Sequence, residues 1–439
     1  MKKYISIEEL YKLFIGCNQK ITTDTRKLEN GAIFFALKGE NFDANSFAKN
    51  AIDGGCAYSI VDNENVANNQ TILLVENVLE TLQELARFHR EKLKIPIIGI
   101  TGSNGKTTNK ELIHAVLSKK YKVFATIGNL NNHIGVPLTL LSLTEEHEMA
   151  IVEMGANHQG EIALLSKISD PDYGVITNIG KAHLEGFGGE EGVKKGKSEL
   201  YKHIEKKGGK LFVNGDDSVL LGLSNNISKI YYGENPEFDV YGKQFTISEF
   251  VEFKWNIKNK SLESQPLLKT HMFGHYNFIN LLCAACIGYY FKVSEKDINE
   301  ALAGYIPEMN RSQVKKTKTN TVILDAYNAN PSSMSLAISN FQKQDLGSKI
   351  VILGDMLELG DYSKIEHQKI LTQLEVSDFK KIYLVGVQFL SFNDRFRNYM
   401  FFKTVDELQE FLKNNNISDS TVLIKGSRGV RLEKIVELL

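Results

Sequence analysis

An apolar strand, a glycine-rich loop and a helix follow one another near residue 100. The strand is expected over Ile97–Ile100, the loop reads T-G-S-N-G-K-T-T from Thr101 to Thr108, and a helix continues to about Lys119. Glycines let backbone N–H groups converge on phosphate oxygens, and a helix N-terminus favours an anion. The alternative is a glycine-rich turn with a solvated lysine, which the order of strand, loop and helix disfavours. The unit predicts a nucleotide phosphate site within an α/β domain.

The loop is shorter than the eight-residue Walker pattern, because only G-x-x-G-K-T remains. Lys106 is placed to reach the β- and γ-phosphates, and Thr107 to bind Mg²⁺. A magnesium nucleotide also attracts carboxylates. Glu153 closes one expected strand and His183 follows the next, where ligands of parallel sheets bind. Helix capping or a lysine ion pair remains an equal interpretation of Glu153, and lone histidines are more often structural.

Apolar runs alternate with helical patterns along the 439 residues, which is typical of α/β folds and, at about 150 residues per domain, predicts three domains. We place them at 1–94, a small mixed domain, at 95–309, a central phosphate-loop domain, and at 310–439, a doubly wound Rossmann-like domain. Met1–Phe14 is expected to form an amphipathic helix, and Phe238–Lys258 alternates like antiparallel strands at a sheet edge. The remaining expected strands are 32–37, 58–61, 71–75, 150–154, 175–178, 211–214, 322–325, 350–353, 382–385 and 422–424, with helices near 79–92, 332–344, 363–375, 404–415 and 431–438.

The chain is almost neutral, with 52 Lys and Arg against 53 Asp and Glu. This balance gives no global field that would attract nucleic acid or an anionic membrane. The N-terminal segment lacks the apolar core of a signal peptide, and the longest apolar run, Leu281–Phe291, is too short for a bilayer. Cys283 and Cys286 lie in an apolar helical pattern and are interpreted as buried, not as zinc ligands. A cytoplasmic protein is expected.

Five short motifs occur in a fixed order along the chain. They are T-G-S-N-G-K-T-T at 101–108, E-M-G at 153–155, T-N-I-G-x-A-H-L at 177–184, K-S-E at 197–199 and N-G-D-D at 214–217. They resemble the ATP-dependent Mur ligases, which build the peptide stem of bacterial cell-wall precursors. Two further segments, 325–331 (DAYNANP) and 353–360 (LGDMLELG), resemble the member that joins D-alanyl-D-alanine to a UDP-N-acetylmuramoyl tripeptide.

The resemblance assigns roles to individual residues and makes 1–94 the domain that binds the UDP substrate. The implied catalytic residues are Lys106, His183 and Lys197, and the implied Mg²⁺ ligands are Thr107, Glu153 and His183. The implied ATP-binding residues are Gly102, Ser103, Asn104, Gly105, Lys106, Thr107, Thr108, Asn277, Asn280, Arg311 and Asp325. The implied substrate-binding residues are Thr25, Arg26, Lys38, Asn129, Asn131, Asn132, Tyr327 and Asn330.

Several of these residues also have ordinary interpretations. Lys197 carries a carbamate in the relatives, whereas its helical pattern alone indicates a surface lysine. The asparagine cluster at 129–132 would otherwise be a turn. Arg311 could form an interdomain salt bridge, and Asp325 could cap a helix. Lys425-Gly426-Ser427-Arg428 resembles a family motif that is structural or near the incoming amine.

The resemblance implies ATP and Mg²⁺ as cofactors and an acyl phosphate as intermediate. We expect a monomer, and because the implied nucleotide contacts come from both the central and the third domain, we expect these domains to close when ATP binds. A sister Mur ligase, a folylpolyglutamate-type ligase, and a non-catalytic nucleotide-binding protein or kinase are the alternatives. The sequence leaves open whether the tripeptide ends in lysine or diaminopimelate, whether Lys197 is carbamylated and which oligomer forms.

Overall fold

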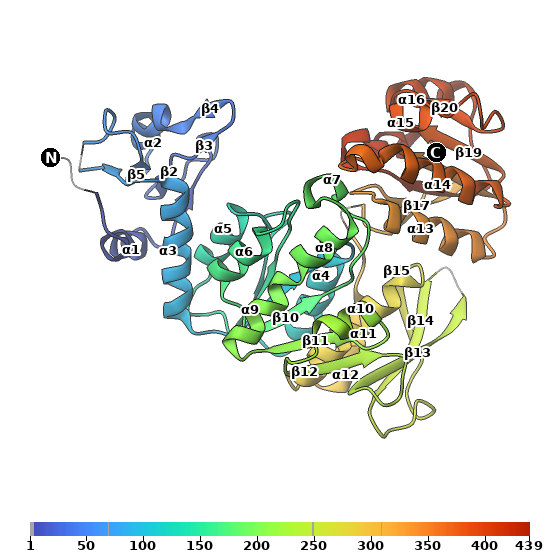
Figure 1. Ribbon diagram of the computed structural model, residues 1–439, viewed down its shortest axis with the longest axis horizontal. Coiled ribbons are helices and arrows are strands. Elements are labelled where there is room, and N and C mark those ends of the chain that lie inside the picture. The colour runs from blue at the N-terminus through green and yellow to red at the C-terminus, as the bar shows by residue number, and fades with distance from the viewer. Residues whose placement is uncertain (1–3, 69, 248–249, 309) are drawn as a thin grey trace. The chain divides into compact units, whose positions relative to one another are not determined.

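The computed structural model describes residues 4–68, 70–247, 250–308 and 310–439, and Figure 1 labels its elements. Residues 1–3 of the expected first helix, 248–249 of the expected antiparallel segment and residue 309 at an expected domain boundary lie outside the described residues. The chain forms two compact units. The first comprises Met1–Gly99, Tyr121–Gly155 and Glu161–Gly174, and the second comprises Ile100–Lys120, Ala156–Gly160 and Val175–Leu439. The boundaries between the three expected domains stay a prediction.

The N-terminal block is a small parallel sheet with helices. Its four strands have the order β1-β2-β5-β6, and every neighbouring pair is parallel. Helix α1 begins with a capping box in which Ser6 and Glu9 bond each other's backbone N–H, which satisfies two donors that the helix leaves open. The elements are α1 (Ile7–Gly16), β1 (Ile21–Thr22), β2 (Ile33–Phe35), β3 (Lys38–Gly39), β4 (Phe42–Asp43), η1 (Ala44–Phe47), α2 (Ala48–Asp53), β5 (Tyr58–Val61), β6 (Ile72–Leu74) and α3 (Val78–Leu93).

The central strands belong to a nine-stranded sheet with the order β15-β14-β13-β12-β11-β10-β7-β9-β8. Its elements are β7 (Ile97–Thr101), α4 (Lys106–Leu117), β8 (Val123–Ala125), α5 (Gly135–Leu141), β9 (Met149–Glu153), α6 (Glu161–Ser169), β10 (Tyr173–Ile176), α7 (Leu184–Phe187), α8 (Glu190–Lys197), α9 (Glu199–Lys207), β11 (Lys210–Asn214), α10 (Ser218–Leu223), β12 (Lys229–Gly233), β13 (Val240–Ile247), β14 (Phe250–Ile257), β15 (Leu268–Phe273), α11 (Tyr276–Tyr290) and α12 (Glu295–Gly304). The antiparallel interpretation of β13 and β14 is confirmed, but the outermost strand is β15.

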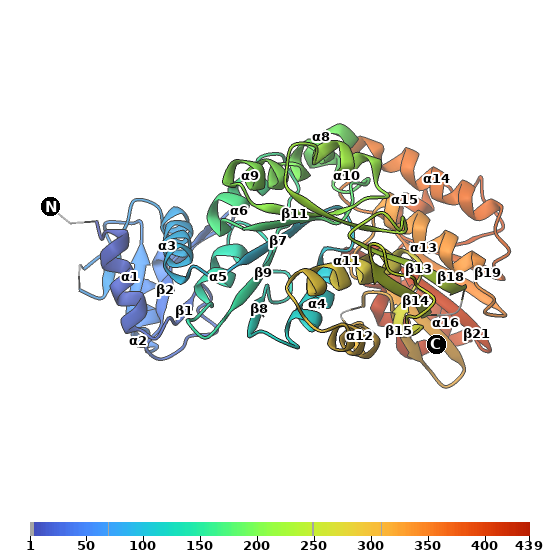
Figure 2. The same cartoon turned by 90° about the horizontal axis from the view of Figure 1, so that it is seen from below.

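Helices α4 and α11 lie side by side (Figure 2). Gly288 allows this approach, since a Cβ there would stand 2.4 Å from Val116 Cγ1. Cys283 and Cys286 are free thiols on α11 with no exposed surface, so their interpretation as buried residues is confirmed. Burial raises the pKa of Cys283 to about 12. Among the described residues, no helix is both long enough and apolar enough to cross a membrane.

The C-terminal block is the expected doubly wound sheet. Five parallel strands have the order β17-β21-β18-β19-β20, and β16 adds an antiparallel edge. The apolar side chains of α16 and η4 share a core with one face of these strands, including Leu408, Ile435 and Ile352. The elements are β16 (Gln313–Lys316), β17 (Asn320–Asp325), α13 (Pro331–Lys343), β18 (Lys349–Gly354), η2 (Gly360–Tyr362), α14 (Ser363–Glu375), β19 (Lys381–Val385), α15 (Val387–Leu390), β20 (Met400–Phe402), α16 (Val405–Asn414), β21 (Ser420–Lys425), η3 (Arg428–Val430) and η4 (Leu432–Leu438).

The last expected helix forms differently. Residues 432–438 are a 3-10 helix that follows Arg431, whose φ of +59° lies in the left-handed region. Hydrogen bonds over three residues, such as Lys434 N–H to the Arg431 carbonyl, replace the α-helical pattern. Leu432 and Ile435, three residues apart, both lie in the C-terminal core, as the three-residue period of a 3-10 helix allows.

Candidate active site

The phosphate loop leaves β7 and enters α4 through two glycines in the left-handed region. Gly102 has φ +144°, and a Cβ there would stand 1.9 Å from Thr177 Oγ1. Gly105, with φ +76°, is the N-cap residue of α4. The loop therefore takes the path that the glycines predicted, with its backbone turned at the start of a helix.

The loop side chains implied to bind ATP differ in exposure. Thr107 is buried at the first turn of α4, while Lys106 and Thr108 are partly exposed. The ammonium of Lys106 donates to the carbonyl of Gly102 at 2.8 Å. Lys106 thus folds back onto the phosphate loop, from which it is expected to reach the β- and γ-phosphates.

The segment after β10 supports the phosphate loop. Thr177 Oγ1 donates to the Asn104 carbonyl at 2.6 Å, and the backbone N–H of Ser103 donates to the Asn178 carbonyl at 3.0 Å. The Gly180 N–H in turn donates to Ser103 Oγ at 2.9 Å. These bonds fix the loop backbone before any phosphate binds.

Asn277 and Asn280, which are expected to bind ATP, are bonded within the protein. Asn277 is buried, and its amide donates to the Phe273 carbonyl at 2.7 Å while its oxygen accepts from Asn280 at 2.8 Å. The Asn280 oxygen accepts from Asn109 at 2.7 Å. In this structure both asparagines join the start of α11 to α4, and their role in ATP binding stays a prediction.

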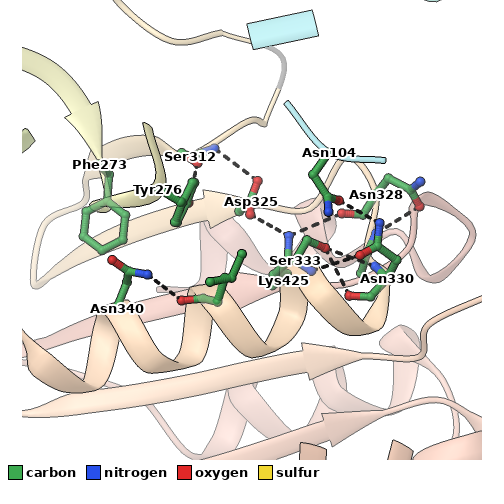
Figure 3. A network of polar contacts seen from close by, with 12 residues as sticks. Asn104, Phe273, Tyr276, Ser312, Asp325, Asn328, Asn330, Ser333, Asn340 and Lys425 are labelled. Carbon is green, nitrogen blue, oxygen red and sulfur yellow. Dashed lines mark hydrogen bonds and ion pairs between the residues drawn. The ribbon is translucent and has the colours of Figure 1, made fainter. Parts of the chain in front are cut away.

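The C-terminal block meets the phosphate loop through Asn330. This residue caps α13 by accepting from the Ser333 N–H at 2.9 Å, and its amide donates to Asn104 Oδ1 at 2.7 Å (Figure 3). Lys181 N–H donates to Ser332 Oγ at 2.9 Å close by. The loop and the first turn of α13 therefore form one polar contact.

Asp325 lies at the end of β17 within a connected set of polar groups (Figure 3). Its carboxylate pairs with the buried Lys425 at 2.6 Å and accepts from the Ser312 N–H at 3.3 Å. The hydroxyls of Ser312 and Tyr276 lie 2.7 Å apart. Burial, together with the charge of Asp325, raises the pKa of Tyr276. Lys425, from the K-G-S-R motif, is thus a structural partner of Asp325, which is expected to bind ATP.

Tyr327 carries two guanidinium groups on its ring. Arg311 lies 3.8 Å from the ring centroid and Arg428 lies 5.2 Å from it. The buried Nε of Arg311 has no hydrogen-bond partner in the described part of the chain. Arg311, which is expected to bind ATP, therefore makes a cation–π contact with the ring of Tyr327 in the structure, where the sequence alone allowed an interdomain salt bridge.

His183 stands beside a carboxylate that sequence reasoning missed. Its Nδ1 contacts Glu358, and this contact lowers the pKa of Glu358. Lys181, two residues earlier, pairs with Glu366 at 3.0 Å. The signal for Glu358 was present in the motif 353–360, but no pattern in the sequence says that this segment faces 177–184.

Lys197 corrects the surface interpretation drawn from its helical pattern. It has no exposed surface, its ammonium donates to the Ala156 carbonyl at 3.1 Å, and it lies 4.9 Å from the centroid of the Phe187 ring. The helix α8 packs Lys197 inward because small glycines at 192 and 196 share its buried face. A buried amine is what a carbamate would require, and the carbamate itself stays a prediction.

In the other compact unit, Glu153 is buried at the end of β9. Its Oε1 accepts from the amide of Asn131 at 2.8 Å, and its backbone N–H donates to Thr126 Oγ1 at 3.0 Å. The exposed Asn132 accepts from the Gly135 N–H at 2.8 Å, and exposed Asn129 accepts from the Asn131 N–H. The asparagine cluster is therefore a turn whose Asn131 holds the predicted metal ligand.

The expected uridine-nucleotide residues lie near carboxylates. Arg26 is exposed and bonds Asp24 at 2.8 and 2.9 Å, which lowers the pKa of Asp24 to about 2. Lys38 pairs with Asp62 at 2.8 Å. The side-chain amide of Asn45 also donates to Asp62 at 2.8 Å. Asn45 is buried, and the sequence analysis assigned it no role.

Thr25, also expected to bind the substrate, lies between Asp24 and Arg26 in the sequence and is half-buried. The roles of Thr25, Arg26 and Lys38 stay predictions.

Three stretches of the chain match domains of one family. Residues 19–90 match "Mur ligase family, catalytic domain", 100–288 match "Mur ligase middle domain" and 310–428 match "Mur ligase, glutamate ligase domain". The chain belongs to the Mur ligase family. The three-domain α/β fold expected from the sequence is therefore confirmed, and this Mur ligase is an enzyme that forms amide bonds with ATP.

Relatives of this Mur ligase match it over nearly their whole length. A protein of Bacillus subtilis (strain 168) named UDP-N-acetylmuramoyl-tripeptide--D-alanyl-D-alanine ligase is 35% identical, covering 95% of this chain and 92% of that protein. The Escherichia coli (strain K12) protein of the same name is 33% identical, with coverages of 95% and 93%.

Solved structures agree with these relatives. MurF from Acinetobacter baumannii superposes with a TM-score of 0.87 at 32% identity, covering 95% of this chain and 93% of that one. MurF from Thermotoga maritima in complex with ADP superposes with a TM-score of 0.82 at 27% identity, covering 96% of this chain and 97% of that one. The Mur ligase fold of this chain thus has a relative that holds an adenine nucleotide.

Proposed function

We propose that this Mur ligase joins the terminal carboxylate of a UDP-N-acetylmuramoyl tripeptide to the amino group of D-alanyl-D-alanine, with cleavage of ATP to ADP and phosphate. The observation that carries the proposal is the full-length similarity to relatives with that name, in a chain whose phosphate loop is complete. The product is a precursor of the peptidoglycan cell wall.

A carboxylate at neutral pH is a poor electrophile, so the γ-phosphoryl group is first transferred to it. The amine of D-alanyl-D-alanine then attacks the acyl phosphate, an amide bond forms and phosphate leaves. The protein positions the reactants and neutralises charge. Lys106 exchanges its bond to the Gly102 carbonyl for the phosphates, and Arg311, held on Tyr327, supplies a second cation.

The side chains that would hold Mg²⁺ are the predicted ones, Thr107, Glu153 and His183. Within the described ranges, no group of three or more His, Cys, Asp or Glu side chains could hold a metal ion. The argument for Mg²⁺ therefore depends on the donor atoms of each residue taken singly. A buried threonine hydroxyl and a buried carboxylate offer the oxygen atoms that Mg²⁺ prefers. The ion would neutralise phosphate charge. Buried Lys197, as a carbamate, would add another oxygen ligand.

The experiment is a product assay with the purified protein, ATP and Mg²⁺. UDP-muramoyl tripeptides ending in lysine or in diaminopimelate are each supplied with D-alanyl-D-alanine, and phosphate release and product mass are measured. We expect one or both tripeptides to give a pentapeptide product with one phosphate per amide bond. Product only from a shorter peptide with a single amino acid would identify a sister ligase, and ATP binding without any amide would exclude the proposal.

Lys106→Ala provides the control for this assay. The charge of the lysine is expected to stabilise the transferred phosphoryl group, so its loss lowers turnover by at least about 10²-fold. A variant that kept its turnover would contradict the role of the phosphate loop.

A further inference from the structure

A buried carboxylate on α14 takes no part in the chemistry described above. Glu366 is 5% exposed and accepts hydrogen bonds from two lysines, Lys369 of its own helix at 2.7 Å and Lys181 of the segment after β10 at 3.0 Å. Burial opposes the charged form of Glu366, but the hydrogen bonds from the two lysines outweigh it and lower the pKa of this carboxyl. A buried charge is tolerated where such partners stay in place, so Glu366 favours one position of the Lys181 ammonium.

Lys181 is bound to the C-terminal block at two points. Its ammonium pairs with Glu366, and its backbone N–H donates to Ser332 Oγ in the first turn of α13 at 2.9 Å. The ammonium also lies 3.3 Å from the carboxylate of Glu190, whose side chain is 66% exposed. Water and salt screen an exposed pair more than a buried one, so Glu366 is the stronger of the two partners.

The residue before Lys181 supports the phosphate loop. The Gly180 N–H donates to Ser103 Oγ at 2.9 Å, and the Ser103 hydroxyl lies 3.0 Å from the Gly180 carbonyl. A Cβ at Gly180 would stand 2.9 Å from Ser332 Oγ, so the segment fits closely against α13 on its other side. A displacement of Lys181 would therefore reach the loop through Gly180 and Ser103.

We propose that Lys181 is a positioning residue for ATP, which holds residues 177–181, and through them the phosphate loop, by pairing with Glu366. The inference rests on the proposed function only in that ATP is the nucleotide bound at this loop. Through Glu366, the C-terminal block shapes a loop that belongs to the central block.

The test separates positioning from the electric field of the two charges. Lys181→Met removes a cation and Glu366→Gln removes an anion, so the field alone would weaken ATP binding in the first variant and strengthen it in the second. Loss of positioning weakens binding in both. The readout is Kd for the β,γ-imido analogue of ATP with Mg²⁺, measured by titration calorimetry. We expect Kd to rise about 3- to 30-fold in each variant and no further in the double variant, because both residues act through one pair.

Lys369→Met and Glu190→Gln are the matched controls. They remove the other lysine on Glu366 and the other carboxylate on Lys181, and each leaves the proposed pair intact. We expect Kd within about twofold of the wild type in both. Unchanged affinity in Lys181→Met, tighter binding by Glu366→Gln or an equal loss in Lys369→Met would overturn the proposal.

Melting temperatures show whether each variant is folded at the temperature of the titration. Glu366→Asp takes the place of Glu366→Gln if the glutamine variant does not fold. It keeps the charge but shortens the side chain, so it is also expected to weaken binding of the analogue. Lys181→Arg keeps the cation and should bind the analogue more tightly than Lys181→Met, and equal affinities of these two would contradict a role of the charge pair.

Turnover supplies a second readout. KM for ATP is expected to rise in Lys181→Met and Glu366→Gln, while kcat at saturating ATP and KM for D-alanyl-D-alanine stay within about twofold of the wild type. A fall in kcat with no change in KM for ATP would contradict positioning of the nucleotide. If the wild type formed no pentapeptide, the proposed function would fail, and the affinity for the analogue would still decide the role of Lys181.

Discussion

The side-chain amide of Asn330 donates a 2.7 Å hydrogen bond to the side-chain oxygen of Asn104. The bond joins the N-terminus of α13 in the C-terminal block to the phosphate loop of the central block (Figure 3). The side-chain oxygen of Asn330 caps α13, whereas its side-chain nitrogen bonds Asn104. Substitutions can therefore separate the helix cap from the contact with the loop.

Asn330→Ser should keep the helix cap and lose the bond to Asn104, whereas Asn330→Ala should lose both. A cap is worth about 1 kcal/mol, so only the alanine variant is expected to be clearly destabilised. Loss of one hydrogen bond at the loop predicts an increase of about 2- to 10-fold in KM for ATP in both variants. Thermal unfolding and ATP kinetics check this, and an unchanged KM in the serine variant would show that the contact does not serve the nucleotide.

Tyr327 is predicted to act through the face of its ring. Tyr327→Phe keeps the surface on which Arg311 lies and should retain activity near that of the wild type. Tyr327→Leu removes a cation–π contact worth about 0.5–2 kcal/mol, so KM for ATP should rise by about 2- to 30-fold. Steady-state kinetics of the two variants separate this role from one of the hydroxyl, which would affect the phenylalanine variant equally.

Lys197 is predicted to act as a carbamate. Lys197→Ala should reduce turnover on the order of 10²-fold, and a short carboxylate such as acetate should partly restore it by taking the place of the carbamate. The control is Lys195→Ala, which alters an exposed lysine on the same helix and should leave turnover unchanged. Absence of rescue, together with an unmodified Lys197 by mass spectrometry under bicarbonate, would contradict this prediction.

We expect buried His367 to make the protein less stable in mildly acidic solution. The ring is buried, its Nε2 accepts from the Met356 N–H at 3.0 Å, and its Nδ1 donates to the Ser363 carbonyl at 2.8 Å. Burial lowers the pKa of His367 below its ordinary value of about 6.5. The unfolded chain therefore binds the proton first, and the free energy of unfolding falls as pH drops below about 6.5, down to the folded-state pKa.

Urea denaturation between pH 8 and 5 measures this effect. His367→Gln should be less stable at pH 8 and should lose less stability than the wild type on acidification. His133→Gln, at an exposed position, should follow the wild-type curve. Parallel curves for the wild type and His367→Gln would show that this histidine does not carry the pH dependence.

Much of the fold followed from local patterns. The phosphate loop, the alternation of strands and helices in the C-terminal block and the burial of Cys283 and Cys286 were predicted correctly, since each depends on neighbouring residues. The 3-10 form of 432–438 and the edge position of β15 were not, because packing against distant elements decides them.

The candidate site shows the same division. Motifs named His183, Lys181 and Asn330, but not the contacts that these residues make. Asn330 with Asn104, His183 with Glu358 and Lys181 with Glu366 are pairs that only the folded chain brings together, and no short-range pattern records the pairing of 177–184 with 353–366.

The sequence by itself determined the family, the α/β architecture and the residues expected to bind phosphate. Glycine turns, the loop lysine and the periodicity of apolar residues depend on residues that are close together in the chain. Only the tertiary structure decided that Lys197 is buried, that Asp325 pairs with Lys425 and that His183 meets Glu358. Burial and charge pairing depend on which distant segments pack together, and these long-range contacts fix the environment of each side chain.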